Sequence, residues 1–258
     1  MLVALAQLAP RARDVAANAA RARELVRSSE QADLVVLPEL FLSSYVTTGV
    51  EELAVPLDGP ELSELRETAR EAATALIVGL AEWTPAGIAN TAVLIEASGD
   101  LAAAYRKTHL FGAERDAYVA GDELSTVQLG GRTVGPMVCF DLEFPEVTRA
   151  LAARGADLLV TISANPARFD LDHGVFARAR ALESGLPHVY VNRVGDQDGV
   201  RFGGNSIALD PDGRVLAEAG SDGERIVVAE IGAPGRRDSR TRYAEMLRPS
   251  LYVPTARA

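Results

Sequence analysis

The chain has 258 residues, of which 48% are hydrophobic and 24% charged, and its net charge is −10 with a pI of about 4.9. This composition suits a soluble globular protein with a sizeable core. The acidic balance argues against nucleic acid or an anionic membrane as the main partner. The single cysteine excludes an intrachain disulfide and fits a reducing compartment, so we expect a cytoplasmic protein. No stretch is apolar enough to span a membrane, and the apolar start lacks the basic region of a signal peptide.

Short apolar runs alternate with longer amphipathic runs along the chain, which is typical of an α/β fold. In the first half we expect strands at 3–7, 32–39 and 76–83, a hairpin at 90–107, and helices at 13–31 and 59–75. In the second half we expect strands at 132–139, 156–163, 187–195 and 224–231, a hairpin at 204–220, and helices at 144–155 and 172–185.

The two halves each have strands enough for one sheet. Two sheets packed face to face with helices outside would give a four-layer sandwich, and a single doubly wound sheet is the alternative. Because no low-complexity linker separates the halves, the sequence predicts one domain over residues 1–258.

Three residues with useful chemistry directly follow predicted strands. Glu39 ends "LVVLPE", Lys107 ends "LAAAYRK" and Cys139 ends "TVGPMVC". In α/β folds, sites gather outside the carboxyl ends of strands. A base, a cation and a thiol nucleophile can therefore meet at one edge.

Cys139 has two interpretations. The plainer one is a buried thiol that packs as a small apolar side chain. Against it, a strand, a turn and a helix beginning near Pro145 form an elbow that can expose a side chain. A nearby helix N-terminus would also lower the pKa of the thiol. A Cys–His pair that uses His109 or His188 as base stays open, whereas one cysteine and scattered histidines do not make a metal site.

Lys107 is the only lysine among 26 basic residues. A surface charge is the ordinary role of a lysine, but a chain that otherwise uses arginine suggests a place that needs a compact ammonium. Glu39 follows a buried run, and burial would raise the pKa of its carboxyl toward that of a general base. Glu114 lies seven residues after Lys107 and by itself looks like an exposed loop charge.

Three segments together resemble the signature blocks of the nitrilase superfamily of carbon–nitrogen hydrolases. They are "LPELFLSSY", "YRKTHLFG" followed by Glu114, and "CFDLEFPE", and they occur in the family's order and spacing. "GGNSIALDPDGRVLAEAG" resembles the family's late hairpin, and the likeness runs from Met1 to about Gly220. The resemblance implies the four-layer α-β-β-α sandwich.

The resemblance also implies roles and partners. Cys139 would be the nucleophile, Glu39 the general base and Lys107 the cation for the tetrahedral intermediate, while Glu114 would orient the substrate or the lysine. The backbone N–H of Phe140 would help to hold the oxyanion. The resemblance implies a homodimer or larger assembly, with residues 233–258 reaching across a subunit. Neither a metal nor an organic cofactor is needed for this chemistry.

The block around Cys139 is closer to amidases than to true nitrilases, and with "YRKTHLFG" it resembles 5-aminopentanamidases and related aliphatic amidases. Glu143 stands where amidases of dicarboxylic ω-amides often carry arginine, so it would favour a substrate with a cationic tail. The plainer interpretation is that Glu143 faces solvent or caps a helix.

The expected substrate contacts are Phe140, Glu143, Tyr45 and Asn165. Two departures from the family pattern, Ser44 before Tyr45 and Pro166 after Asn165, can reshape the pocket wall. The alternatives are an N-carbamoyl-amine hydrolase, an omega-amide hydrolase, or a catalytically silent binding protein on the same fold.

Overall fold

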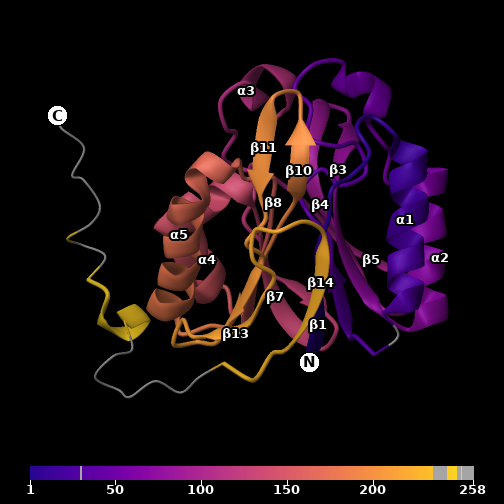
Figure 1. Cartoon of the computed structure of the whole chain (residues 1–258). Helices are drawn as coiled ribbons and strands as arrows, with labels where there is room; N and C mark the ends of the chain where they lie inside the picture. The colour runs from indigo at the N-terminus through magenta and orange to yellow at the C-terminus, as the bar shows by residue number, and fades with distance from the viewer. Residues whose placement is uncertain (30, 235–242, 249–250, 252–258) are drawn as a thin grey trace.

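The computed structural model describes residues 1–29, 31–234, 243–248 and 251, and Figure 1 shows its elements. The α-helices are α1 (Val15–Ser28), α2 (Pro60–Ala72), α3 (Glu114–Ala117), α4 (Pro145–Ala153) and α5 (Asp170–Ser184). The strands of the first half are β1 (Leu2–Gln7), β2 (Leu34–Val36), β3 (Ala75–Thr84), β4 (Gly87–Ile95) and β5 (Leu101–Arg106).

The remaining strands are β6 (Val127–Leu129), β7 (Arg132–Val138), β8 (Leu158–Ser163), β9 (His188–Asn192), β10 (Val194–Gln197), β11 (Val200–Gly203), β12 (Ile207–Leu209), β13 (Val215–Glu218) and β14 (Arg225–Glu230). Short 3₁₀ turns are η1 (Val50–Leu53), η2 (Cys139–Glu143), η3 (Ala167–Phe169) and η5 (Tyr243–Met246).

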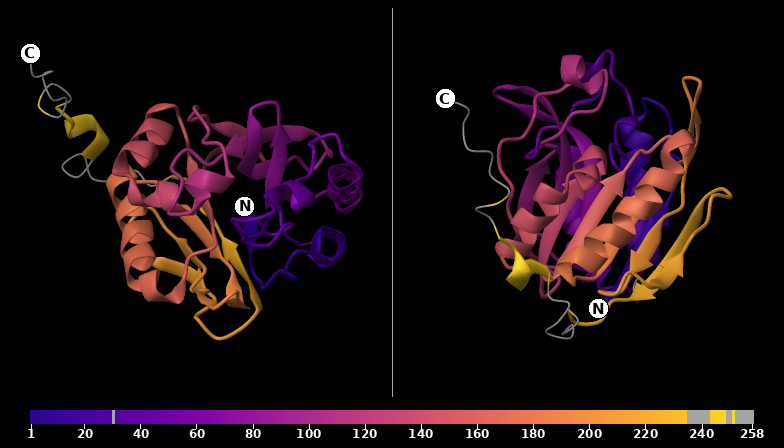
Figure 2. Two further views of the ribbon diagram at one scale, coloured as in Figure 1. Left: turned by 90° about the horizontal axis from the view of Figure 1, so that it is seen from above. Right: turned by 90° about the vertical axis from the view of Figure 1, so that its left-hand side faces the viewer.

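The strands form two mixed six-stranded sheets with helices outside. The first sheet has the order β14-β1-β2-β3-β4-β5 and the second β13-β12-β9-β8-β7-β6, while β10 and β11 pair as a separate hairpin. Figure 2 shows the layers from above, with α1 and α2 on one side and α4 and α5 on the other. The predicted α-β-β-α sandwich is confirmed, and the doubly wound single sheet is wrong.

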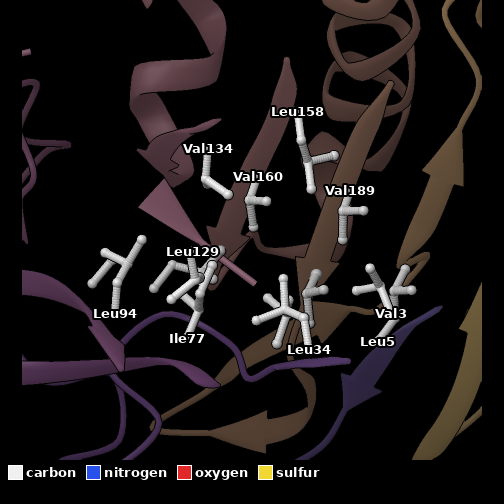
Figure 3. Packing of buried hydrophobic residues seen from close by; sticks show 14 of the residues in the cluster. Val3, Leu5, Leu34, Ile77, Leu94, Leu129, Val134, Leu158, Val160 and Val189 are labelled. Atoms are coloured by element: carbon white, nitrogen blue, oxygen red, sulfur yellow. The ribbon is translucent and has the colours of Figure 1, made fainter. Parts of the chain in front are cut away.

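The core between the sheets explains the continuous apolar runs. Leu34 and Val36 point toward the second sheet, while Val35 packs with α1 and α2 on the other face. Figure 3 shows side chains from both sheets meeting in this layer, among them Ile77 of β3 and Val160 of β8. A strand covered on both faces cannot alternate apolar and polar residues, so the helical layers on the outside follow from the sequence pattern.

Some boundaries differ from those predicted. The run 187–195 contains two strands, because the chain leaves β9 after Asn192 and enters the β10–β11 hairpin. The late strand β14 pairs antiparallel with β1 and so joins the first sheet. Strand β6 and helix α3, with three and four residues, are too short to give a periodic signal.

Most of the segment 233–258, predicted to contact a second subunit, lies outside the described residues. That role and the single domain over 1–258 stay predictions. Among the residues that the structure describes, no helix is long and apolar enough to cross a membrane. The same part of the chain contains no group of three or more His, Cys, Asp or Glu placed to hold a metal ion.

His188 on β9 is fully buried as a neutral ring. Its Nδ1 donates to the Ala177 carbonyl at 3.1 Å, and Nε2 accepts from the Thr161 hydroxyl at 2.8 Å. Burial lowers the pKa of His188 to about 4 from 6.5. Below pH 6.5 the unfolded chain binds a proton on this histidine, whereas the folded chain binds it only below about pH 4. The free energy of unfolding therefore decreases as the pH is lowered from 6.5 to 4.

We therefore expect His188 to contribute about 3 kcal/mol to the loss of unfolding free energy between pH 7 and pH 4. Urea unfolding at the two pH values, for the wild type and His188→Gln, measures this contribution as a difference between their pH dependences. Carboxylates common to both proteins cancel in that difference. Equal pH dependence in the two proteins would show that burial does not shift this histidine.

Candidate active site

Three strands, two from the first sheet and one from the second, deliver Glu39, Lys107 and Cys139 to one end of the sandwich. Glu39 follows β2, Lys107 follows β5 and Cys139 follows β7. Lys107 Nζ lies 2.7 Å from Glu39 Oε1. Helix α3, which begins at Glu114, lies at the same end, at the top of Figure 1. The expectation that these strand ends meet is correct, and Glu114 joins them.

Glu39 is fully buried and fixed by hydrogen bonds on both carboxylate oxygens. Oε1 accepts from Lys107 Nζ and from Asn90 Nδ2, each at 2.7 Å, and Oε2 accepts from the backbone N–H of Ala164 at 2.7 Å. The backbone of Glu39 rests directly on Gly79 of β3, where a side chain's β-carbon would approach the Glu39 Cα to 2.7 Å. Any larger residue at 79 would push the carboxylate out of place.

Lys107 is fully buried between two carboxylates. Nζ donates to Glu39 and also to Glu114 Oε1 at 2.9 Å. Desolvation by burial lowers the pKa of Lys107, but the charges of Glu39 and Glu114 outweigh it and leave the pKa well above its usual value. Burial raises the pKa of Glu114 despite the attraction of Lys107. The ammonium is therefore charged at every working pH.

Glu114 is not the exposed loop charge that its local sequence suggests. It is fully buried, accepts from the Tyr45 hydroxyl at 2.8 Å and accepts from the backbone N–H of Phe111 at 2.9 Å. These bonds hold it against Lys107, as the family resemblance implied and the residue context did not.

Cys139 is the first residue of η2 and has a left-handed backbone, with φ of +47°. That conformation is strained for a residue with a side chain, and such strain gathers at functional sites. Helix α4 begins only at Pro145, so no α-helix starts at the thiol. Burial raises the pKa of Cys139, helped by the charge of Glu39 and opposed by that of Lys107. The predicted lowering of the pKa by a helix N-terminus is therefore wrong: the resting thiol keeps its proton.

Asp141 stabilises the η2 turn through hydrogen bonds, a role that was not predicted from the sequence. Its Oδ2 accepts from the Tyr105 hydroxyl at 2.8 Å and from the backbone of Val138 at 3.1 Å. Its Oδ1 accepts from Thr108 and His109, one residue and two residues after Lys107. A buried carboxylate two residues after Cys139 thus ties the lysine segment to the nucleophile turn. An aspartate between Phe140 and Leu142, directly after an apolar strand, was the available signal.

All four predicted substrate contacts line the small cavity that contains Cys139. Tyr45, Phe140, Glu143 and Asn165 form its wall together with other residues, and its volume is about 20 Å³. Among the described residues, Asn165 Nδ2 is one of the few buried side-chain donors without a hydrogen-bond partner. The cavity therefore offers a free polar group beside apolar ring faces.

Of the two departures from the family pattern, Pro166 lines this cavity and Ser44 directly precedes Tyr45 in its wall. Ser44 has φ of +60°, a conformation that favours glycine, and its hydroxyl accepts from the backbone of Arg13 at 3.0 Å. The left-handed backbone at 44 favours glycine, and the serine in its place adds a hydrogen bond to the neighbouring backbone.

Neither histidine proposed as an alternative base lines this cavity. His109 bonds to Asp141 and stacks on Phe144, with ring centroids 3.9 Å apart, and His188 bonds to Thr161. The third histidine, His173, does line the cavity. Its Nδ1, however, is hydrogen-bonded to the Tyr190 hydroxyl at 2.9 Å.

Known proteins with similar sequences are named as hydrolases and amidases. The family model for carbon–nitrogen hydrolases matches residues 2–240. A hydrolase in the pqqF 5′ region of Pseudomonas protegens is 39% identical over 98% of this chain and 90% of its own. An (R)-stereoselective amidase of a Pseudomonas species is 40% identical over 88% of this chain and 84% of its own.

Solved structures of the amidase from Nesterenkonia sp. AN1 have the same fold. They match with a TM-score of 0.85 and 31% identity over 97% of this chain and 95% of theirs. One mutant of that amidase carries the acetamide moiety of fluoroacetamide on its active-site cysteine, and another is bound to butyramide. With a family match over nearly its whole length and these relatives, the chain belongs to the carbon–nitrogen hydrolases of the nitrilase superfamily, among amidase-type enzymes.

Proposed function

We propose that the protein hydrolyses short aliphatic carboxamides to the acid and ammonia through a thioester on Cys139. One observation carries the proposal: Lys107 Nζ lies within 2.9 Å of both Glu39 and Glu114, and Glu114 lines a small cavity together with the Cys139 thiol. A binding protein has no physical need to bury these charges together, since buried charges cost stability.

In the first half of the reaction, Glu39 takes the proton from the thiol while the sulfur attacks the amide carbon. A base is needed because burial keeps the thiol protonated. The negative charge that develops on the carbonyl oxygen is stabilised by the Lys107 ammonium and by the backbone N–H of Phe140. Glu39 then passes the proton to the leaving nitrogen, and ammonia departs.

In the second half, water replaces ammonia and Glu39 removes one of its protons. The hydroxide equivalent attacks the thioester carbon, and the same ammonium stabilises the second tetrahedral intermediate. The carbon–sulfur bond breaks, the proton returns to the thiol and the acid leaves. Glu114 keeps Lys107 in place throughout, because its carboxylate is itself fixed by Tyr45 and Phe111.

The cavity favours a short substrate with a positive end. Its volume of about 20 Å³ is enough for about one water molecule, so the cavity must widen to admit a substrate and favours a short one. The side chain of Glu143 is 31% exposed and lines the same cavity. Its main chain is anchored by Arg180, which donates to the Glu143 carbonyl at 2.9 Å. A carboxylate at this place attracts an ammonium and repels the carboxylate of an ω-amide, so 5-aminopentanamide is the preferred candidate.

Glu143→Gln tests this choice, because it removes the charge and keeps the shape. We expect the KM for 5-aminopentanamide to rise about fivefold to tenfold, while the KM for pentanamide changes less than about twofold. Glu146→Gln is the matched control, since Glu146 lies three residues further on, at the exposed start of α4. Equal effects of Glu143→Gln on the two amides would mean that Glu143 does not recognise the amine.

Ammonia release from an amide panel tests the function itself. The panel contains 5-aminopentanamide, pentanamide, an ω-amide that bears a carboxylate, and an N-carbamoyl amine. Release from the first two supports the proposal, and preference for the ω-amide keeps the amidase and removes the role of Glu143. Turnover of the carbamoyl substrate alone, or of none, overturns the aliphatic amidase.

A further inference from the structure

A line of buried, hydrogen-bonded polar side chains runs from His173 to Ser163, and none of them is hydrogen-bonded to Glu39 or Lys107 among the described residues. His173 Nδ1 lies 2.9 Å from the Tyr190 hydroxyl, which donates to Ser163 Oγ at 3.3 Å. Ser163 ends β8 beside the end of β7, where Val138 pairs with Ile162, so the next residues, Cys139 and Ser163, are neighbours.

The outer end of this line returns to the cavity. His173 Nε2 lies 3.5 Å from Glu143 Oε1, and both residues line the cavity with Cys139. The three inner side chains are almost entirely buried: His173 is 3% exposed, Tyr190 2% and Ser163 0%. Apolar residues of similar size would fill this part of the core at lower cost, because buried polar groups must all be satisfied. Packing alone does not explain three polar residues in a row.

We propose that His173, Tyr190 and Ser163 form a hydrogen-bonded relay that links Glu143 in the cavity wall to Cys139 and stabilises its thiolate. The inference rests on the proposed function, in which Cys139 is the nucleophile. These three are positioning residues, since they act on the substrate only through the sulfur.

The direction of the hydrogen bonds supports this role. Because the Tyr190 hydroxyl donates to Ser163, His173 Nδ1 must donate to Tyr190, and the Ser163 hydroxyl is left to donate to the sulfur. A donor beside the sulfur favours the thiolate, and Ser163 lowers the pKa of Cys139 against the larger effect of burial.

Glu143 biases the histidine tautomer. With Nδ1 donating to Tyr190, a neutral ring leaves Nε2 without a proton, and the free carboxylate 3.5 Å away opposes this form because it attracts a proton to Nε2. A substrate ammonium bound at Glu143 would weaken that attraction and favour the Nδ1–H form. Binding of a substrate amine at Glu143 would therefore increase the reactivity of the Cys139 sulfur through the relay.

Several charged groups face the two ends of the relay. Those around the sulfur are Glu39, Lys107 and Glu114, and those around His173 are Glu143 from η2 and Asp170 from its own helix. None of these is altered by a change at Tyr190. A change in thiol reactivity on removing the Tyr190 hydroxyl therefore reports on the relay.

Alkylation by iodoacetamide measures this reactivity directly, because Cys139 is the only cysteine and the label reports on no other thiol. Tyr190→Phe keeps the ring and removes the hydroxyl. We expect its alkylation rate between pH 6 and 9 to be about tenfold below wild type, which corresponds to a thiol pKa about one unit higher. The kcat for pentanamide falls with it, while KM stays the same.

Ser163→Ala is the second variant and keeps the test valid if Tyr190→Phe fails to fold. Thr161→Val is the matched control: Thr161 is also fully buried on β8, two residues earlier, and its hydroxyl bonds to His188 outside the relay. We expect the control to alkylate within about twofold of wild type, since the strand and the burial are shared.

A purely structural role predicts the opposite result. Loosened packing exposes the thiol and speeds alkylation, so rates equal to or above wild type in Tyr190→Phe and Ser163→Ala overturn the relay. The measurement needs no amide turnover. A wild type that cleaves no amide but shows the slowed variants disproves the proposed function and supports the relay, whereas normal amidase activity with unslowed variants does the reverse.

Discussion

Cys139→Ala is expected to lower ammonia release by about 10⁴-fold or more. The chain contains no second cysteine, and without the sulfur no thioester can form. Glu39 and Lys107 keep their charges in this variant, so they can still hold an amide and stabilise an oxyanion. Water attacking an unactivated amide without the covalent step is far slower, because amide nitrogen is a poor leaving group.

The alanine variant must be folded for this result to count. Cys139 is 8% exposed and packs in the core between the sheets, so removing the sulfur costs stability of about 1 kcal/mol and leaves the fold intact. Unfolding curves for the wild type and the variant check this, and Thr161→Val shows what a buried change on β8 does to the rate. Ammonia release by folded Cys139→Ala above about 1% of wild type would exclude the thioester route.

The layers of the fold could be predicted because their cause is local. A strand such as β2 that is apolar at every position must be covered on both faces, and the intervening helices can lie only outside. The return of β14 to β1 could not be predicted, because it pairs Leu2 with Glu230 across almost the whole chain. No local pattern encodes which edge a late strand joins.

The site was predictable to the same extent. The residue types and their places after strands predicted Glu39, Lys107 and Cys139, and only the family resemblance added Glu114. Burial decided what the sequence could not: desolvation raises the pKa of the Cys139 thiol, and the thiol lies at a short 3₁₀ turn with no α-helix N-terminus to lower it. The supporting hydrogen bonds of Asn90 and Asp141 could not be predicted, because most of their partners are distant in sequence.

Lys107→Arg is expected to lower ammonia release by about 10³-fold although it keeps the positive charge. Lys107 is fully buried, and its Nζ bonds to Glu39 and Glu114 at 2.7 and 2.9 Å. A guanidinium is wider and planar, and it would pair with one of these carboxylates through two bonds. The base would then be drawn away from the sulfur, and the charge would no longer point at the oxyanion.

Arg106→Lys is the matched control, because it makes the reverse exchange one residue earlier. Arg106 pairs with Glu82 outside the cavity and is 42% exposed, so we expect its turnover to stay within about twofold of wild type. Steady-state kinetics on pentanamide compares the two variants once their unfolding curves show that both are folded. Since any cation at 107 supplies the same net charge, wild-type turnover by Lys107→Arg would show that charge alone is required. The single lysine in a chain of arginines would then have no catalytic meaning.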